Sequence, residues 1–240
     1  MQQPADSNNG CRMIRAIIFD LDGTLADTEP LHFEAFARVL RGEGIELDRA
    51  QYFSRLIGFD DRDCFATVLR ESGRGVASGS LAALIARKAA VYQELIAGRD
   101  VTFPGAADFV RRCARRFPLI VATGTLRVEA ELILNRAGVR ELFVDIIAAE
   151  DVEHGKPAPE GFEKALGRLG FLLRLRPPLE PAECLVIEDT VAGIEAARRA
   201  GMRVLALCHS GRPEELKGAE IVRNSLAETD LDELLREFSR

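Results

Sequence analysis

The sequence lacks the features of a membrane-spanning, secreted or zinc-thiolate protein. Its 240 residues contain no apolar run near the roughly 18 residues that cross a bilayer. Residues 1–10 are polar and have no signal-peptide stretch. The five cysteines are scattered, with no CxxC pair and no zinc spacing, so we expect buried free thiols. We therefore expect a cytoplasmic protein with no membrane partner and a flexible tail at residues 1–13.

The sequence also lacks a long basic run. It carries 32 Lys and Arg against 38 Asp and Glu, a formal net charge of −6. Nucleic-acid binding depends on clustered cations that release counterions, so we expect no nucleic-acid partner. A small anionic ligand is not excluded. With 47% hydrophobic residues, the chain can bury a core and is not disordered, and we expect a monomer.

Short apolar runs alternate with helical patterns along most of the chain. Near-continuous Val, Ile and Leu predict buried strands at residues 16–19, 119–122, 144–147, 185–187 and 204–207. Helical periodicity covers residues 106–117, 127–137, 159–169 and 192–200. This alternation predicts an α/β fold whose core is a Rossmann-like parallel sheet with right-handed crossovers.

One long stretch departs from the alternation. Apolar residues recur at three-to-four spacing in residues 32–41, 61–71 and 81–97. We therefore expect an inserted all-helical domain at residues 28–99, with a core built from residues 14–27 and 100–227. Residues 73–75 and 78–80 are interpreted as interhelical loop, and residues 171–181 as a loop extension.

Four acidic residues follow two of the predicted strands. Asp20 and Asp22 come directly after the first strand, and ligands of open parallel sheets bind at the carboxyl ends of the strands. An Asp-Gly turn is the simpler alternative; a calcium loop fails because its twelfth position is Leu31. Glu188 and Asp189 follow the fourth strand and would either cap the next helix or join the first pair. Together they indicate a Mg²⁺ site and phosphoryl chemistry.

Three further polar positions follow the second and third strands. Thr123 would cap a helix or, with the backbone amide of Gly124, hold phosphate oxygens. Lys156 is either a solvated charge or a cation that offsets the acids and binds phosphate. The loop around Lys156 is no nucleotide P-loop, because Pro157 stands where a Ser or Thr is required.

These residues, taken in order, resemble the four motifs of the haloacid dehalogenase-like hydrolases. The motifs are residues 20–24 (DLDGT), Thr123, Lys156 and the pair Glu188 and Asp189, and their spacing covers residues 15 to 226. The helical insert resembles the small cap of the subgroup that contains β-phosphoglucomutase, phosphoglycolate phosphatase and sugar-phosphate phosphatases. Cap residues His32, Arg62 and Lys88 resemble substrate-facing positions of that subgroup, although a lone histidine on such a helix is otherwise a surface residue.

The resemblance implies roles for the core motifs. Asp20 is the nucleophile that becomes an aspartyl phosphate, and Asp22 is the general acid and base. Thr123 and the Gly124 amide bind the transferred phosphoryl group, and Lys156 offsets its charge.

The resemblance also implies the metal ligands and the class of reaction. Mg²⁺ would be held by the side chains of Asp20, Glu188 and Asp189 and by the backbone carbonyl of Asp22. Because this acid cluster is present, dehalogenation is disfavoured. We expect a Mg²⁺-dependent phosphatase for a small phosphorylated metabolite, a sugar phosphate. A phosphomutase is the alternative, weakened because Leu126 replaces a phosphate-binding lysine of β-phosphoglucomutase. A non-catalytic binder of such metabolites is the second alternative.

Overall fold

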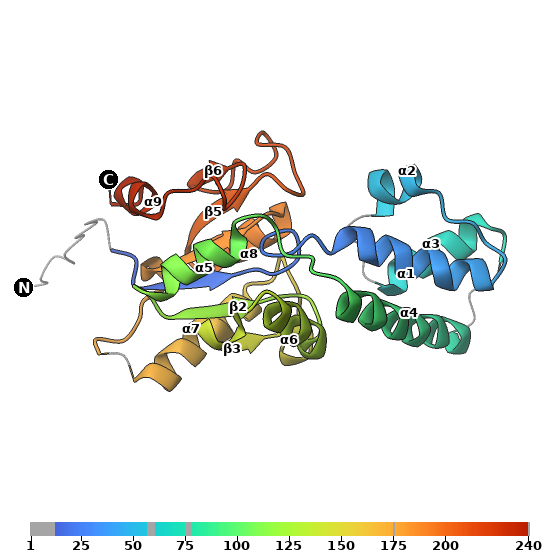
Figure 1. Ribbon diagram of the computed structural model, residues 1–240, viewed down its shortest axis with the longest axis horizontal. Helices are drawn as coiled ribbons and strands as arrows, with labels where there is room; N and C mark the ends of the chain where they lie inside the picture. The colour runs from blue at the N-terminus through green and yellow to red at the C-terminus, as the bar shows by residue number, and fades with distance from the viewer. Residues whose placement is uncertain (1–12, 57–60, 75–77, 175, 240) are drawn as a thin grey trace, which may run out of the picture.

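The structure is a computed structural model that describes residues 13–56, 61–74, 78–174 and 176–239. Six parallel strands form one sheet in the order β3-β2-β1-β4-β5-β6 (Figure 1). The strands are β1 Ala16–Phe19, β2 Leu119–Ala122, β3 Phe143–Ile147, β4 Cys184–Glu188, β5 Arg203–Leu207 and β6 Ile221–Arg223. The expected α/β, Rossmann-like class is confirmed, and five predicted strands lie within one residue of their predicted ends.

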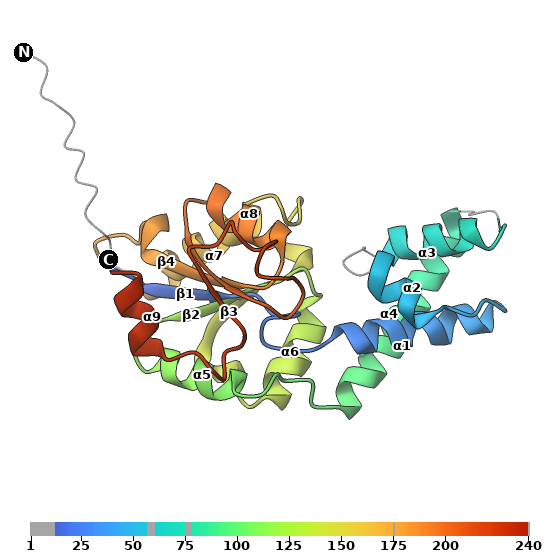
Figure 2. The same cartoon turned by 90° about the horizontal axis from the view of Figure 1, so that it is seen from above.

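Helices cover both faces of the sheet. Successive strand residues point to opposite faces, and in these strands the side chains on both faces are apolar, so each face is buried by helices. Ile17 and Phe19 pack against α5 Ala106–Ala114, α6 Arg127–Arg136 and α9 Leu231–Glu237. Ala16 and Ile18 pack against α7 Glu160–Leu173 and α8 Val191–Arg199. Figure 2 shows the two layers from above. The strands are buried on both faces, as the near-continuous apolar runs predict.

A second helical group projects from one end of the sheet (Figure 1). This group, called here the helical insert, contains α1 Glu29–Gly42, α2 Arg49–Gln51, a π-helical turn Tyr52–Leu56, α3 Asp61–Glu71 and α4 Ser78–Gly98. It has its own apolar cluster, which includes Phe36, Leu40 and Phe65. Its inner end, with Leu31 and Tyr92, joins the apolar cluster of the sheet.

The two chain segments that connect the sheet to the helical insert run side by side. Ala26 and Thr102 form an isolated antiparallel bridge. The Asp27 amide donates to the Val101 carbonyl at 2.8 Å, and the Phe103 amide donates to the Leu25 carbonyl at 2.9 Å. The insert therefore leaves and rejoins the sheet through one short two-stranded ladder.

Several expectations about individual elements were wrong. Helix α7 continues to Leu173, so the first three residues of the expected loop 171–181 are helical, and α4 already begins at Ser78. Leu172 and Leu173 are good helix formers, which explains the longer α7. Helix α5 ends at Ala114 rather than residue 117. Strand β6, helix α9 and the turn at Tyr52–Leu56 were not predicted, because each is short and lacks a full apolar period.

Four cysteines lie in the described part of the chain, and three of them are buried. Cys64, Cys113 and Cys184 pack in the apolar clusters, as expected. Cys208 is only partly buried because it follows β5 where the chain leaves the sheet. Cys11 lies outside the described residues. Among the described helices, none combines the length and apolarity needed to cross a bilayer.

Candidate active site

The order of the sheet reverses at β1, which has β2 on one side and β4 on the other. In register, Phe19 is level with Ile187, and the Asp20 amide donates to the Ile187 carbonyl at 3.0 Å. Asp20 and Glu188 therefore emerge side by side at the carboxyl ends of neighbouring strands. A reversal of this kind opens the crevice in which doubly wound sheets bind ligands.

Three carboxylates converge at this point. One oxygen each from Asp20, Glu188 and Asp189 lies within 4.8 Å of the other two, and all three side chains are buried. Burial, with the charges of Glu188 and Asp189, raises the pKa of Asp20 well above its usual value. Burial and Glu188 raise the pKa of Asp189 to about 7. The cluster holds more negative charge than its surroundings stabilise, which favours a cation there.

Lys156 is the cation that the chain itself supplies to this cluster. Its ammonium group donates to the carboxylates of both Asp20 and Glu188. Burial alone would lower the pKa of Lys156, but the two carboxylates outweigh it and raise the pKa above its usual value. The lysine is therefore a partly buried charge paired with two carboxylates, and it compensates only part of the negative charge.

Glu188 is held rigidly at the start of α8. Its Oε2 accepts the amide hydrogens of Asp189 at 2.8 Å and Thr190 at 2.9 Å, and the Thr190 hydroxyl at 3.0 Å. Thr190 in turn caps the helix by accepting the Gly193 amide at 3.0 Å. A Cβ atom at Gly193 would lie 1.7 Å from Glu188 Oε1, so any other residue there would displace this carboxylate.

Asp189 offers the clearest test of whether a metal fits. The Thr24 hydroxyl donates to its Oδ1 at 3.0 Å. Its Oδ2 is buried and has no partner with hydrogen-bond geometry in the described part of the chain, although the Ser210 hydroxyl lies close enough to lower the carboxyl pKa. Gly23 has a positive φ of 78°, and a Cβ there would come within 2.0 Å of the same oxygen. A buried carboxylate oxygen with no donor, in a crowded acidic cluster, suits a divalent cation.

Asp22 lies beside this cluster but outside it. Its carboxylate accepts the Thr28 hydroxyl at 2.6 Å, the Thr123 hydroxyl at 3.3 Å, and the hydroxyl of Thr125. Thr123 Oγ1 also accepts the Thr125 amide at 3.0 Å. Gly124, between these two threonines, is exposed. The structure thus brings Thr123 to Asp22, and Thr28 connects Asp22 to the start of the helical insert.

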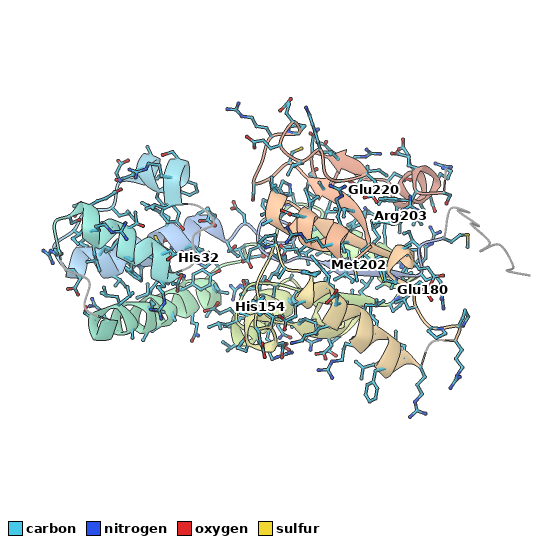
Figure 3. All side chains as sticks on the ribbon, turned by 180° about the vertical axis from the view of Figure 1, so that it is seen from behind. His32, His154, Glu180, Met202, Arg203 and Glu220 are labelled. Atoms are coloured by element: carbon cyan, nitrogen blue, oxygen red, sulfur yellow. The ribbon has the colours of Figure 1, made fainter. Side chains whose placement is uncertain are left out.

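His32 and Lys88 meet inside the helical insert. Lys88 is buried and donates to His32 Nδ1 at 2.8 Å and to Asp61 Oδ1 at 2.7 Å. An ammonium group only donates, so His32 accepts at Nδ1 and carries its proton on Nε2. Burial and the Lys88 charge hold the pKa of His32 well below its usual value, and its ring stacks on Tyr92 with centroids 4.0 Å apart. His32 lies at the end of the insert that faces the sheet (Figure 3).

Arg62 does not join this group. It is exposed on α3 and forms no hydrogen bond or ion pair within the described residues. The neighbouring segment at residues 57–60 lies outside the described part of the chain.

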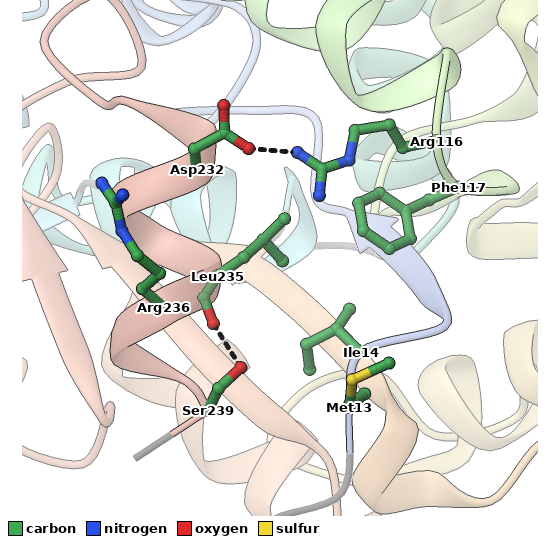
Figure 4. A pocket seen from close by; sticks show the side chains of 8 residues that line it. All are labelled: Met13, Ile14, Arg116, Phe117, Asp232, Leu235, Arg236 and Ser239. Carbon is green, nitrogen blue, oxygen red and sulfur yellow. Dashed lines mark hydrogen bonds and ion pairs between the residues drawn. The ribbon is translucent and has the colours of Figure 1, made fainter.

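A cavity beside the acid cluster lies between the sheet and the helical insert. Its volume is about 430 Å³, and its lining includes Asp22, Asp189, Glu29 and His209. Another cavity, of about 570 Å³, lies at the amino end of β1 beside α9. It is lined by the ion-paired Arg116 and Asp232 and by apolar side chains (Figure 4), but it contains none of the clustered carboxylates and is not the candidate site.

Glu129 is a buried acid near the site that sequence reasoning missed. It lies in the first turn of α6, is 6% exposed, and is influenced by the charges of Lys88 and Asp22. Burial raises its pKa to about 7, although Lys88 opposes this change. In the amphipathic pattern of α6 it stands at a core-facing position, which is the only sequence signal for it.

We expect Glu129→Gln to stabilise the protein at alkaline pH. A raised pKa means that the folded state binds this proton more tightly, so its contribution to stability falls as pH rises from about 4.5 to 7. The glutamine variant avoids that loss and should be more stable than the wild type by about 1–3 kcal/mol at pH 8.5 and by little at pH 4.5. Urea unfolding at both pH values measures this; an equal difference at the two pH values would contradict it.

Other site residues were also absent from the sequence predictions. Thr28, Thr125 and Thr190 act through hydroxyl groups that local spacing does not mark, since threonine is common in turns and caps. Gly193 stands inside a helical pattern, where an isolated glycine signals a packing reason. His209 follows β5, and nothing in its local sequence indicates that it lines a cavity together with Asp22.

The chain resembles known proteins over most of its length. Residues 14–201 match the family model described as haloacid dehalogenase-like hydrolase. Validoxylamine A 7'-phosphate phosphatase from Streptomyces hygroscopicus subsp. limoneus is 34% identical, over 90% of this chain and 96% of the relative. Fructose-1-phosphate phosphatase YqaB from Escherichia coli (strain K12) is 32% identical, over 78% of this chain and 92% of the relative.

The fold has a close counterpart among solved structures. The CbbY mutant from Rhodobacter sphaeroides in complex with xylulose-(1,5)bisphosphate superposes with a TM-score of 0.76 at 32% identity, over 90% of this chain and 96% of that chain. The family resemblance inferred from the motifs is confirmed: this chain belongs to the haloacid dehalogenase-like hydrolases.

Proposed function

We propose that this hydrolase is a Mg²⁺-dependent phosphatase that cleaves a small phosphorylated metabolite, a sugar phosphate, through an aspartyl-phosphate intermediate. The observation that carries the proposal is the pairing of Asp20 with Lys156 beside the donor-free oxygen of Asp189. This arrangement supports the roles of nucleophile for Asp20, of charge-balancing cation for Lys156 and of metal ligand for Asp189. The names of the phosphatase relatives and the sugar bisphosphate bound to CbbY support the substrate class.

Asp20 is the proposed nucleophile. Lys156 binds its Oδ1, which orients the carboxylate and leaves the other oxygen for attack on phosphorus. As the new O–P bond forms, the P–O bond to the leaving alcohol breaks, and the phosphoryl group remains on Asp20. Lys156 also offsets the repulsion between the carboxylate and the phosphate dianion, and Thr123 with the Gly124 amide holds the phosphoryl oxygens.

Asp22 is the proposed general acid and base. It donates a proton to the departing alcohol and later takes one from the water that hydrolyses the aspartyl phosphate. The hydroxyls of Thr28, Thr123 and Thr125 fix its carboxylate in one orientation. Because Thr28 immediately precedes α1, a movement of the helical insert is coupled to the position of this carboxylate.

The proposed metal site consists of Asp20 and Asp189, with Glu188 beside them. Glu188 has one oxygen committed to three donors and the other to Lys156, so Asp189 Oδ2 is the more available ligand. A bound Mg²⁺ supplies positive charge that lowers the barrier to attack on a phosphate dianion.

Residues of the site weigh against both alternatives. A phosphomutase of the β-phosphoglucomutase type is expected to carry a lysine where Leu126 stands, and Leu126 is exposed and apolar. A non-catalytic binder would lack the nucleophile or the acid, yet Asp20 and Asp22 are both present and both held in place.

The test is phosphate release from a panel of sugar phosphates, glycerol phosphate, phosphoglycolate and nucleotides, with millimolar Mg²⁺. We expect turnover to be highest for a sugar phosphate and to fall about 100-fold or more in excess EDTA, with recovery on adding Mg²⁺. Full turnover in EDTA contradicts the metal requirement. Interconversion of hexose phosphates without free phosphate would establish the phosphomutase instead, and no release from any ester contradicts the proposal.

A further inference from the structure

His209 lies on the wall of the cavity beside the acid cluster. It follows β5 and lines the same cavity of about 430 Å³ as Asp22 and Asp189. Lys156, Thr123 and Gly124 do not line this cavity. The phosphoryl group is assigned to those three residues, so the cavity lies on the side of Asp22 where the leaving alcohol departs.

The imidazole ring of His209 is fixed from two directions. Its Nδ1 lies 2.8 Å from the Gly23 carbonyl oxygen. Its ring stacks on Phe103, with centroids 4.0 Å apart and planes inclined by 25°. Both contacts are made outside the helical insert, to residues that come before and after it in the chain.

These contacts determine which ring nitrogen is available. A carbonyl oxygen only accepts, so Nδ1 carries the hydrogen of this bond. In the neutral ring, Nε2 is then an acceptor, and no described residue donates to it. A fixed acceptor beside the leaving-group position suits one partner in particular, a hydroxyl hydrogen of a polyhydroxylated alcohol.

We propose that His209 is a specificity-determining residue whose Nε2 accepts a hydrogen bond from a hydroxyl of the leaving alcohol, selecting phosphate esters of polyols over esters without a second hydroxyl. The inference rests on the proposed phosphatase function and deepens it. A residue that follows strand β5 of the sheet thus contributes to recognition of the alcohol, in addition to the helical insert.

Two substitutions of His209 distinguish the contribution of Nδ1 from that of Nε2. In His209→Asn, the side-chain amide reaches the position of Nδ1 and retains the bond to Gly23, but nothing replaces Nε2. In His209→Gln, the amide reaches the position of Nε2, but the bond to Gly23 is lost. The exposed His154 supplies the matched control, His154→Asn.

The experiment compares kcat/KM for the best sugar phosphate of the panel with kcat/KM for phenyl phosphate, whose leaving group has no second hydroxyl. We expect His209→Asn to lower the ratio of the two values about tenfold, the effect of one lost hydrogen bond. His209→Gln should keep a ratio within about threefold of the wild type while lowering the Tm, because the Gly23 contact is broken. His154→Asn should leave the ratio unchanged.

The possible results distinguish failure of the proposed role of His209 from failure of the proposed sugar-phosphate substrate. An unchanged ratio in His209→Asn, or equal losses of the ratio in the Asn and Gln variants, overturns the role of Nε2. A wild-type enzyme that hydrolyses phenyl phosphate but no hydroxylated ester overturns both this inference and the proposed sugar-phosphate substrate. Normal sugar-phosphate turnover with an unchanged ratio in His209→Asn overturns only the inference about His209.

Discussion

Asp20→Asn is expected to abolish phosphate release, with a loss of about 10⁴-fold or more in kcat. The amide has nearly the shape of the carboxylate but is a poor nucleophile, so no aspartyl phosphate forms. The substitution also removes one oxygen anion from the cluster with Glu188 and Asp189. Phosphate release from the best substrate of the panel, measured with Mg²⁺, tests this expectation.

Loss of activity must be distinguished from loss of folding in this variant. Burial raises the pKa of Asp20, so a neutral side chain at this position removes a buried charge that the protein tolerates poorly. We therefore expect the Tm of Asp20→Asn without metal to equal or exceed that of the wild type. Asp108→Asn, an identical change at an exposed position on α5, is the control and should retain full activity. A folded Asp20→Asn protein with more than about 1% of wild-type activity would contradict the role of Asp20.

Gly193→Ala is the second substitution with a large expected effect. Its Cβ would lie 1.7 Å from Glu188 Oε1 and 2.0 Å from the carboxyl carbon, so the carboxylate must move. That carboxylate binds Lys156 and accepts three hydrogen bonds at the start of α8, and its displacement disturbs both the lysine and the acid cluster. We expect kcat/KM to fall about 100-fold or more, since small displacements of catalytic groups have effects of that size.

The same substitution at Gly167 shows whether the loss of activity in Gly193→Ala comes from the displaced Glu188 carboxylate. Alanine is normally better than glycine inside a helix by about 1 kcal/mol. Gly167 lies within α7, and a Cβ there would meet nothing within 4 Å. Gly167→Ala should therefore be slightly stabilising and fully active. Equal activities of Gly193→Ala and Gly167→Ala would show that Glu188 relaxes without consequence.

The sequence allowed prediction of the buried strands and the acids that follow them, because both signals are local. Near-continuous apolar runs mark strands that are covered on two faces, and the parallel register then places Asp20 level with Glu188. The edge strand β6 has no such run, since all three of its residues are only partly buried. Helix α9 is likewise too short for its periodicity to be distinct.

Site residues that act through a single side-chain hydrogen bond could not be predicted. Thr28 and Thr125 donate to Asp22 from six and 103 residues away in the sequence, and nothing around either residue indicates that partner. The different contacts of Glu188 and Asp189 within the acid cluster could not be predicted either. Glu188 is occupied by Lys156 and the start of α8, whereas Asp189 keeps an oxygen free of donors, and only the three-dimensional positions distinguish them.

The ladder between residues 25–27 and 101–103 allows the helical insert to be exchanged by protein engineering. Ala26 and Thr102 are bridge partners, and paired residues of antiparallel ladders lie about 5 Å apart at Cα. A two-residue hairpin turn spans such a gap, so the polypeptide between the two linkers can be exchanged for another without altering the path of the sheet. Within the described residues, the helical insert is thus joined to the sheet where these two linkers lie side by side, and this is the place to exchange the insert for that of a relative.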